Sequence, residues 1–211
     1  MENKYKKRIL FLGMPDMAII CLSKLVAEGF NIVGVVPPHF TEATYGLMCN
    51  FTKSLRLPLI TYERTMDELD FIHKVRQLDA DIAVVCSYNK KFPPELLKTV
   101  KGGFVNCHPS LLPDYRGANP YSNVIINNEK ETGITLHFMD ENFDTGNIIA
   151  QKKVNIENKE TMGTLFNRMN YLCAEFLSEF LQNFEQNTDV VSMPQPQGEF
   201  KKAPAIDSRN M

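Results

Sequence analysis

Three side chains in the middle of the chain could together catalyse the transfer of an acyl group. An apolar stretch over 103–107 predicts a strand that delivers Asn106 and His108 to its carboxyl end. Because side chains alternate along a strand, these two residues should project in the same direction. Asp144 lies in the acidic turn 140–146, which we expect to face back toward the strand end. We therefore expect an amide, an imidazole and a carboxylate to share one site.

This combination suits the attack of an amine on an acyl group through a tetrahedral intermediate. The Asn106 amide and a charged His108 can donate hydrogen bonds to the oxygen on which negative charge develops. Asp144 can raise the pKa of His108 and collect the proton that the amine loses, directly or through water. No Ser or Cys nucleophile is needed, because a neutral amine attacks by itself. The same residue types also serve as loop caps and turn residues, so spacing alone leaves a structural role open.

Four motifs follow one another in the central stretch: NCHPSLLP at 106–113, Arg116-Gly117, Gly133-Ile-Thr135 and Asp144-Thr-Gly146. In this combination and order they resemble the 10-formyltetrahydrofolate-dependent formyltransferases. That family includes enzymes that formylate glycinamide ribonucleotide, methionyl-tRNA and amino sugars attached to nucleotides. The resemblance implies a doubly wound α/β domain, 10-formyltetrahydrofolate as co-substrate, and Asn106, His108 and Asp144 as the catalytic residues.

The resemblance also implies where the folate binds. The loop after the expected strand 81–86 would line the folate pocket, with Tyr88 and Phe92 as candidate contacts. Asp140 and Phe143, in the acidic turn, are further candidates for binding the co-substrate. In the family this pocket uses backbone groups and apolar side chains around the pterin.

Two residues are candidates for binding the acceptor. Met14 belongs to the stretch 13–17, which lacks the G-x-G-x-x-G spacing of a dinucleotide site and resembles the methionyl-tRNA and sugar enzymes at this position. Arg116 carries a guanidinium that could hold a phosphate group. Lys90 and Lys91 depart from the family's usually more apolar loop, and we expect them to be solvated.

Composition limits the classes of partner. The 211 residues, 44% of them hydrophobic, suffice for one sizeable core and a small appendage. With Lys+Arg 23 against Asp+Glu 25, the formal net charge of −2 favours no broad nucleic-acid surface. The polar N-terminal residues show no signal-peptide core, and no apolar run approaches bilayer length, so we expect no membrane partner.

Cysteines and histidines give no metal-binding pattern. The cysteines are odd in number and scattered, which favours reduced thiols and a cytoplasmic location: Cys21, Cys49, Cys86, Cys107 and Cys173. Cys107 alternates with Asn106 and His108, so we expect it in the core. The other histidines have no partner at metal-ligand spacing and receive no function: His39, His73 and His137.

Strands alternating with helices predict an α/β fold with a doubly wound, mostly parallel sheet and an antiparallel edge. The expected strands are 9–12, 31–36, 59–61, 81–86, 103–107, 133–139 and 147–154. The expected helices are 15–28, 43–55, 66–77, 94–100 and 161–184. The last helix carries an apolar stripe that should pack on the sheet: Leu165, Met169, Leu172, Phe176, Phe180 and Phe184.

We expect a catalytic domain over 1–188 and a linker-like tail over 189–211, which resembles the segment after the catalytic domain in the tRNA and sugar enzymes. The predicted activity is transfer of a formyl group from 10-formyltetrahydrofolate to a primary amine, with an amino-sugar nucleotide as the preferred acceptor. Methionyl-tRNA is the alternative; its enzymes carry a basic insertion after the second strand, whereas 37–46 contains no Lys or Arg. Hydrolysis of the formyl-folate, or folate binding without catalysis, are further alternatives. The sequence leaves open whether the chain forms a homodimer.

Overall fold

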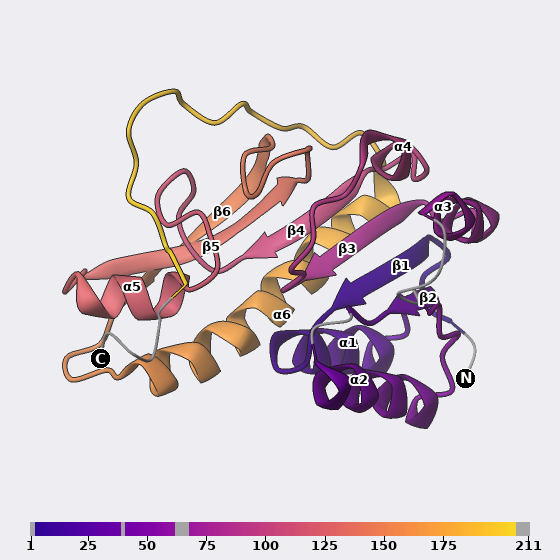
Figure 1. Cartoon of the computed structure of the whole chain (residues 1–211), viewed down its shortest axis with the longest axis horizontal. Helices are drawn as coiled ribbons and strands as arrows, with labels where there is room; N and C mark the ends of the chain where they lie inside the picture. The colour runs from indigo at the N-terminus through magenta and orange to yellow at the C-terminus, as the bar shows by residue number, and fades with distance from the viewer. Residues whose placement is uncertain (1–2, 39–40, 62–67, 206–211) are drawn as a thin grey trace.

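Six strands form one mixed sheet in the computed structural model of the chain, which describes residues 3–38, 41–61 and 68–205 (Figure 1). The strand order is β2-β1-β3-β4-β5-β6. The first four strands in that order run parallel, and the last two join antiparallel. The predicted α/β class, with a mostly parallel sheet and an antiparallel edge, is confirmed. The strands are β1 (Arg8–Gly13), β2 (Asn31–Val36), β3 (Ile82–Cys86), β4 (Phe104–His108), β5 (Glu131–Phe138) and β6 (Ile148–Asn155).

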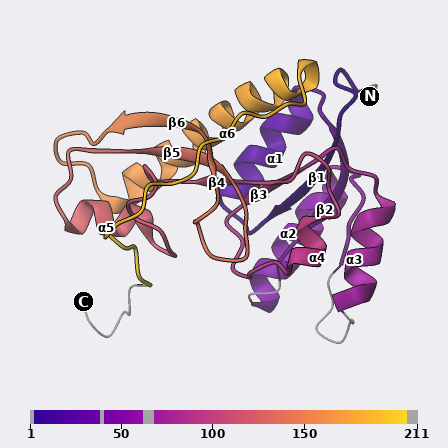
Figure 2. The same cartoon turned by 90° about the horizontal axis from the view of Figure 1, so that it is seen from above.

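Side-chain alternation along β1 divides the core into two layers. Ile9 and Phe11 pack with α1 and α6, whereas Leu10 and Leu12 pack with α3 and α4. The two pairs of helices lie on opposite sides of the sheet in Figure 2, as a doubly wound fold requires. The helices are α1 (Met17–Ala27), α2 (Glu42–Ser54), α3 (Glu68–Gln77), α4 (Pro94–Leu97), α5 (Pro120–Ile126) and α6 (Met162–Gln186).

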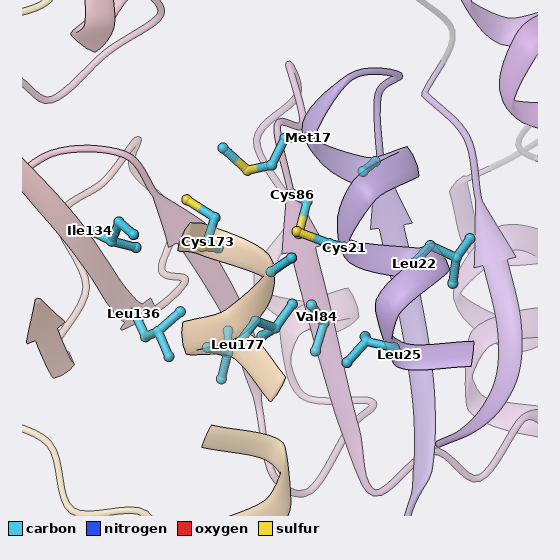
Figure 3. Packing of buried hydrophobic residues seen from close by; sticks show 14 of the residues in the cluster. Met17, Cys21, Leu22, Leu25, Val84, Cys86, Ile134, Leu136, Cys173 and Leu177 are labelled. Carbon is cyan, nitrogen blue, oxygen red and sulfur yellow. The ribbon is translucent and has the colours of Figure 1, made fainter. Parts of the chain in front are cut away.

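Helix α6 runs the length of one face of the sheet beside α1 (Figure 1). Figure 3 shows Cys21 and Leu25 of α1 and Leu177 of α6 directed toward the same strands. The buried face of α6 follows Leu165, Met169, Cys173, Leu177, Leu181 and Phe184. Three members of the expected stripe are only partly buried, because they flank this face: Leu172, Phe176 and Phe180. None of the helices in the described part of the chain combines the length and apolar character that a membrane crossing needs.

Two elements differ from the sequence-based expectation. The expected strand 59–61 is a single bridge between Val35 and Leu59, because Pro58 has no N–H to extend a ladder. The structure adds α5, which the sequence analysis did not assign. Pro120 at the first turn of a helix is a signal that could have indicated it. The expected helix 66–77 is seen from Glu68 to Gln77, and its first two expected residues lie outside the described part.

The junction between β1 and α1 depends on Gly13. A Cβ atom there would lie 2.5 Å from the Ala18 Cβ and 2.6 Å from the Cys86 carbonyl oxygen, both fixed by regular structure. Gly46 in α2 is a matched contrast, since a Cβ there would have no heavy atom within 4 Å.

We expect Gly13→Ala to lower the free energy of unfolding by about 1–3 kcal/mol, because overpacking forces backbone shifts. Gly46→Ala should raise it by about 0.5–1 kcal/mol, because alanine loses less backbone entropy in a helix. Urea unfolding followed by circular dichroism measures both. Equal effects of the two substitutions would contradict the close approach at Gly13.

Candidate active site

A cleft of about 350 Å³ opens at the carboxyl ends of β1, β3 and β4. Ligands of open α/β sheets bind at this edge. The cleft is lined by Met14, Ser87, Tyr88, Asn89, Asn106, Cys107, His108, Pro109, Gly117, Ala118, Pro120, Tyr121, Phe143 and Asp144. A smaller hollow beside it shares four of these residues and adds Lys90, Lys91, His137, Asp140 and Asn142. A hollow of about 380 Å³ at the other end of β4, lined by 101–103 and 188–191, contains none of the three candidate catalytic groups.

The structure brings Asn106, His108 and Asp144 together in this cleft, as the sequence analysis expects. The Asn106 Nδ2 atom lies 3.4 Å from the Asp144 Oδ1 atom. The His108 Nδ1 atom lies 3.5 Å from the same oxygen. The other carboxylate oxygen, Oδ2, accepts a 3.0 Å hydrogen bond from the Gly117 backbone N–H. The catalytic roles of the three residues stay predictions that this geometry permits.

The orientation of His108 is set by a backbone carbonyl. Its Nε2 atom lies 2.9 Å from the Tyr115 oxygen, which can only accept, so Nε2 carries the proton and Nδ1 faces Asp144. Burial lowers the pKa of His108, while the Asp144 carboxylate opposes that effect. The neutral ring therefore has a lone pair at Nδ1, and a proton that binds there lies next to the Asp144 carboxylate.

Asp144 is a carboxylate at neutral pH. Burial by itself would raise its pKa, but the charge of His108, the adjacent His137 ring and a hydrogen bond from the Gly117 N–H outweigh burial and bring it to about 2. The turn that carries Asp144 is tightly constrained. Asp144 has a left-handed φ of 57°, and a Cβ at Gly146 would lie 1.9 Å from the Phe138 carbonyl oxygen. The acidic turn is thus pressed against the end of β5.

His137, to which the sequence analysis assigns no function, belongs to this cluster. It lies opposite Asn106 in the antiparallel pairing of β4 and β5. Its Nε2 atom is 3.0 Å from the Asn106 Nδ2 atom and 3.7 Å from the Asp144 Oδ1 atom. Its Nδ1 atom donates to the Phe138 carbonyl oxygen over 2.8 Å, which leaves Nε2 as an acceptor for Asn106. His137 thereby orients the amide, and only the strand register reveals this.

The candidate folate contacts separate into two groups. Tyr88 and Phe143 line the cleft, and Phe143 is half exposed. Asp140 lines the smaller hollow, where its carboxylate accepts hydrogen bonds from the Thr145 hydroxyl at 2.6 and 2.8 Å. Phe92 is not among the residues that line either space: it is buried, with its ring against those of Tyr88 and Phe104, and its role as a folate contact stays a prediction.

The acceptor candidates also separate. Met14 lines the cleft at the end of β1. Arg116 is not among the residues that line it: its guanidinium donates to the Gln195 side chain and lies 5.8 Å from the Phe200 ring. Its role in binding a phosphate group of the acceptor stays a prediction. Lys91 contacts the acidic turn, with its Nζ atom 3.2 Å from Asn142 Oδ1.

Cysteine and metal chemistry is not evident at the site. All five cysteines are buried as free thiols, including Cys107 between Asn106 and His108. Within residues 3–38, 41–61 and 68–205, no cluster of His, Cys, Asp or Glu has a metal-binding arrangement.

Comparisons with known proteins agree on one family. A family model described as "Formyl transferase" matches residues 23–181. The methionyl-tRNA formyltransferase of Clostridioides difficile is 36% identical over 206 residues, which cover 95% of this chain. That of Caldanaerobacter subterraneus is 34% identical over 205 residues, or 94% of this chain. The chain spans 66% of the length of each of these relatives.

Solved structures share the fold at lower identity. Glycinamide ribonucleotide transformylase 1 from Symbiobacterium toebii superposes with a TM-score of 0.76 at 18% identity, over 92% of this chain and 96% of that one. An N-formyltransferase from Helicobacter canadensis, solved with folinic acid and dTDP-3-aminofucose, gives a TM-score of 0.75 at 20% identity, over 94% and 71%. At such identities these similarities establish the fold alone.

The low pKa of Asp144 makes folding stability depend on pH. A carboxyl whose pKa is lowered on folding contributes stability that is complete above its ordinary pKa and is lost as the pH falls through the folded value. The wild type should therefore lose about 2 kcal/mol more stability than Asp144→Asn between about pH 5 and pH 2. Urea unfolding across this range measures the difference. The control is Asp70→Asn, which removes an exposed carboxylate on α3 and should keep the pH dependence of the wild type. If stability falls equally with pH in Asp144→Asn and in the wild type, Asp144 is not the source of this pH dependence.

Proposed function

The chain belongs to the formyl transferase family, and we propose that it moves the formyl group of 10-formyltetrahydrofolate to a primary amine. The observation that carries this proposal is the approach of Asn106 and His108 to the Asp144 carboxylate within 3.4 and 3.5 Å in one cleft. A purely structural role for these groups would not require a cleft around them. The alternative of folate binding without catalysis is less favoured, because we expected it only if Asn106, His108 and Asp144 lay apart.

The reaction follows from the positions of the donors. The neutral amine attacks the formyl carbon, and the carbonyl oxygen becomes an oxyanion. Asn106 can donate to that oxygen with the N–H whose 3.4 Å bond to Asp144 is long and easily exchanged. His108 becomes a second donor once it takes up a proton at Nδ1, where the Asp144 carboxylate stabilises the positive charge.

Proton transfer completes the reaction. Asp144 collects the amine proton directly or through water, and collapse of the intermediate breaks the bond to N10 of the folate, which takes up a proton. The products are the formamide and tetrahydrofolate. His137 supports this chemistry by holding the Asn106 amide through its Nε2 atom.

Two observations support a folate as the formyl donor. The Helicobacter canadensis structure contains folinic acid, a formylated folate, within the same fold. In this chain, Tyr88 and Phe143 bring two aromatic rings to the cleft, and Asp140 adds a carboxylate to the adjoining hollow. Aromatic faces suit the flat pterin, and a carboxylate suits its N–H groups.

For the acceptor we propose an amino sugar carried by a nucleotide. A tRNA requires a broad cationic surface, because its affinity depends on neutralising several phosphates. The formal net charge of this chain is −2, and residues 37–46 contain no Lys or Arg. A small amine makes no such demand. Because Arg116 is bonded to Gln195, the diphosphate of a sugar nucleotide would bind to groups other than those that line the cleft.

Methionyl-tRNA is the second candidate acceptor. It is favoured by the sequence relatives, which are methionyl-tRNA formyltransferases at 34–36% identity over nearly the whole chain. The cleft also offers apolar surface from Met14, Pro109 and Tyr121, against which a methionine side chain could pack.

Substitutions in the site test the mechanism. Asn106→Ala should lower turnover by about 10²–10³-fold, the usual loss for one oxyanion donor. Asp144→Asn should lower turnover at least as much, because it removes the proton acceptor and the charge partner of His108. Asp70→Asn should leave turnover unchanged. Single-turnover formyl transfer, with folate binding measured by calorimetry, separates chemistry from binding; near-normal turnover in Asp144→Asn would refute the mechanism.

The acceptor is decided by comparing kcat/KM for charged initiator tRNA and for a panel of amino-sugar nucleotides at moderate salt. We expect transfer to a nucleotide-linked amino sugar and poor transfer to methionyl-tRNA. Efficient formylation of the tRNA without sugar activity would reverse the assignment. Release of formate at the same rate with and without amine would instead identify hydrolysis of 10-formyltetrahydrofolate.

A further inference from the structure

The chain beyond α6 returns to the active site. Figure 1 shows this segment passing over β6 and β5 and descending beside α5. Met193 pairs with Ile148 at the free edge of β6 through two hydrogen bonds of 2.7 and 2.8 Å. Further along, Lys201 accepts from the Tyr115 N–H at 2.7 Å, and Ala203 donates to the Arg116 carbonyl oxygen at 2.8 Å. The segment is therefore attached to the edge of β6, just after the acidic turn, and to the Tyr115–Arg116 loop.

Between these attachments, the Gln195 side chain joins the two loops to each other. Its Nε2 atom donates to the carbonyl oxygens of Asp144 at 2.9 Å and Gly146 at 2.8 Å. Its Oε1 atom accepts from the Nε atom of Arg116 at 3.1 Å and from a second nitrogen of the same guanidinium. Both N–H groups and the carbonyl of the amide are thus in use.

This bridge controls a geometry that the carboxylate needs. Asp144 accepts from the Gly117 N–H, which follows Arg116 directly, so the distance between the two loops sets that hydrogen bond. Asp144 also has a left-handed φ of 57°, a conformation that the surrounding contacts must enforce. Without the bridge, the turn can move relative to the Arg116–Gly117 loop, and the carboxylate moves with it.

We propose that Gln195 is a positioning residue that holds the Asp144 turn against the Arg116 loop. Because Asp144 is the proposed proton acceptor, this role rests on the proposed function. Gln195 does not line the cleft, so its loss should affect the chemical step and leave substrate binding in place.

Two substitutions test the two sets of hydrogen bonds that the Gln195 side chain makes. Gln195→Met has a similar length and makes none of the hydrogen bonds. Gln195→Glu keeps an acceptor for Arg116 but loses both donors to the acidic turn. Gln197→Met is the matched control, because Gln197 is exposed two residues further along the same segment. Thermal unfolding establishes that each variant is folded, and Gln195→Glu serves if Gln195→Met does not fold.

We expect kcat to fall about ten- to a hundredfold in both Gln195 variants, the scale of a small misplacement of a reacting group. KM for each substrate should stay within about twofold of the wild type, since binding groups are untouched. The acid limb of the kcat profile should move to higher pH, because a weaker Gly117 hydrogen bond stabilises the charged carboxylate less. Unchanged kcat in Gln195→Met, or a fall in kcat with an unchanged pH profile, would overturn the proposal.

Titration of the Asp144 carboxyl by ¹³C NMR gives a readout that does not depend on activity. Its pKa should be higher in Gln195→Met than in the wild type and in Gln197→Met. An unchanged pKa would overturn the positioning role even in an active enzyme. A wild type that transfers no formyl group would refute the proposed function, while the same titration would still decide the effect of Gln195 on Asp144.

Discussion

The carboxylate of Asp144, whose side chain is only 13% exposed, is the constraint on which the candidate active site depends. A charge removed from water is tolerated only when donors and opposite charges surround it. Here β4 contributes Asn106 and His108, and the Gly117 N–H comes from the loop that follows. The turn itself is tied by Gln195, far along the chain. Several separate segments must therefore be in place before the carboxylate is stable.

The change from parallel to antiparallel pairing makes this arrangement feasible. Because β5 runs against β4, His137 lies opposite Asn106 and the chain leaves β5 at the far end of β4. The turn 140–146 must then fold back to return Asp144 to the strand end. Its close contact with the Phe138 carbonyl, which only a glycine at 146 allows, is the consequence of that reversal. The antiparallel edge thus supplies both an orienting histidine and the carboxylate.

The cleft separates the candidate catalytic groups from the surface that could select the acceptor. The candidate catalytic groups lie on the sheet and on the turn against it, whereas the apolar wall is formed by Met14, Pro109 and Tyr121 from loops and from α5. Loops vary without disturbing a sheet. Among the described residues that line the cleft, none is Lys or Arg, so selection between a sugar nucleotide and a tRNA would depend on groups outside it.

Local patterns in the sequence determined the sheet class, the long amphipathic helix and the pairing of Asn106 with His108. These features follow from the periodicity of side chains along a strand or helix, which needs no distant partner. The acidic turn indicated Asp144, and the motif resemblance narrowed acyl transfer to the transfer of a formyl group from a folate. The seven-residue helix that begins at Pro120 was not predicted, because so short an element carries little periodicity.

Only the tertiary structure decided the contacts made between distant segments. His137 gained its place through strand register, which sequence does not display. Phe92 was buried against Tyr88, and Arg116 was bonded to a glutamine 79 residues further along the chain. Each of these outcomes depends on which backbone lies beside a given side chain, and that is fixed only when the sheet and the returning C-terminal segment assemble.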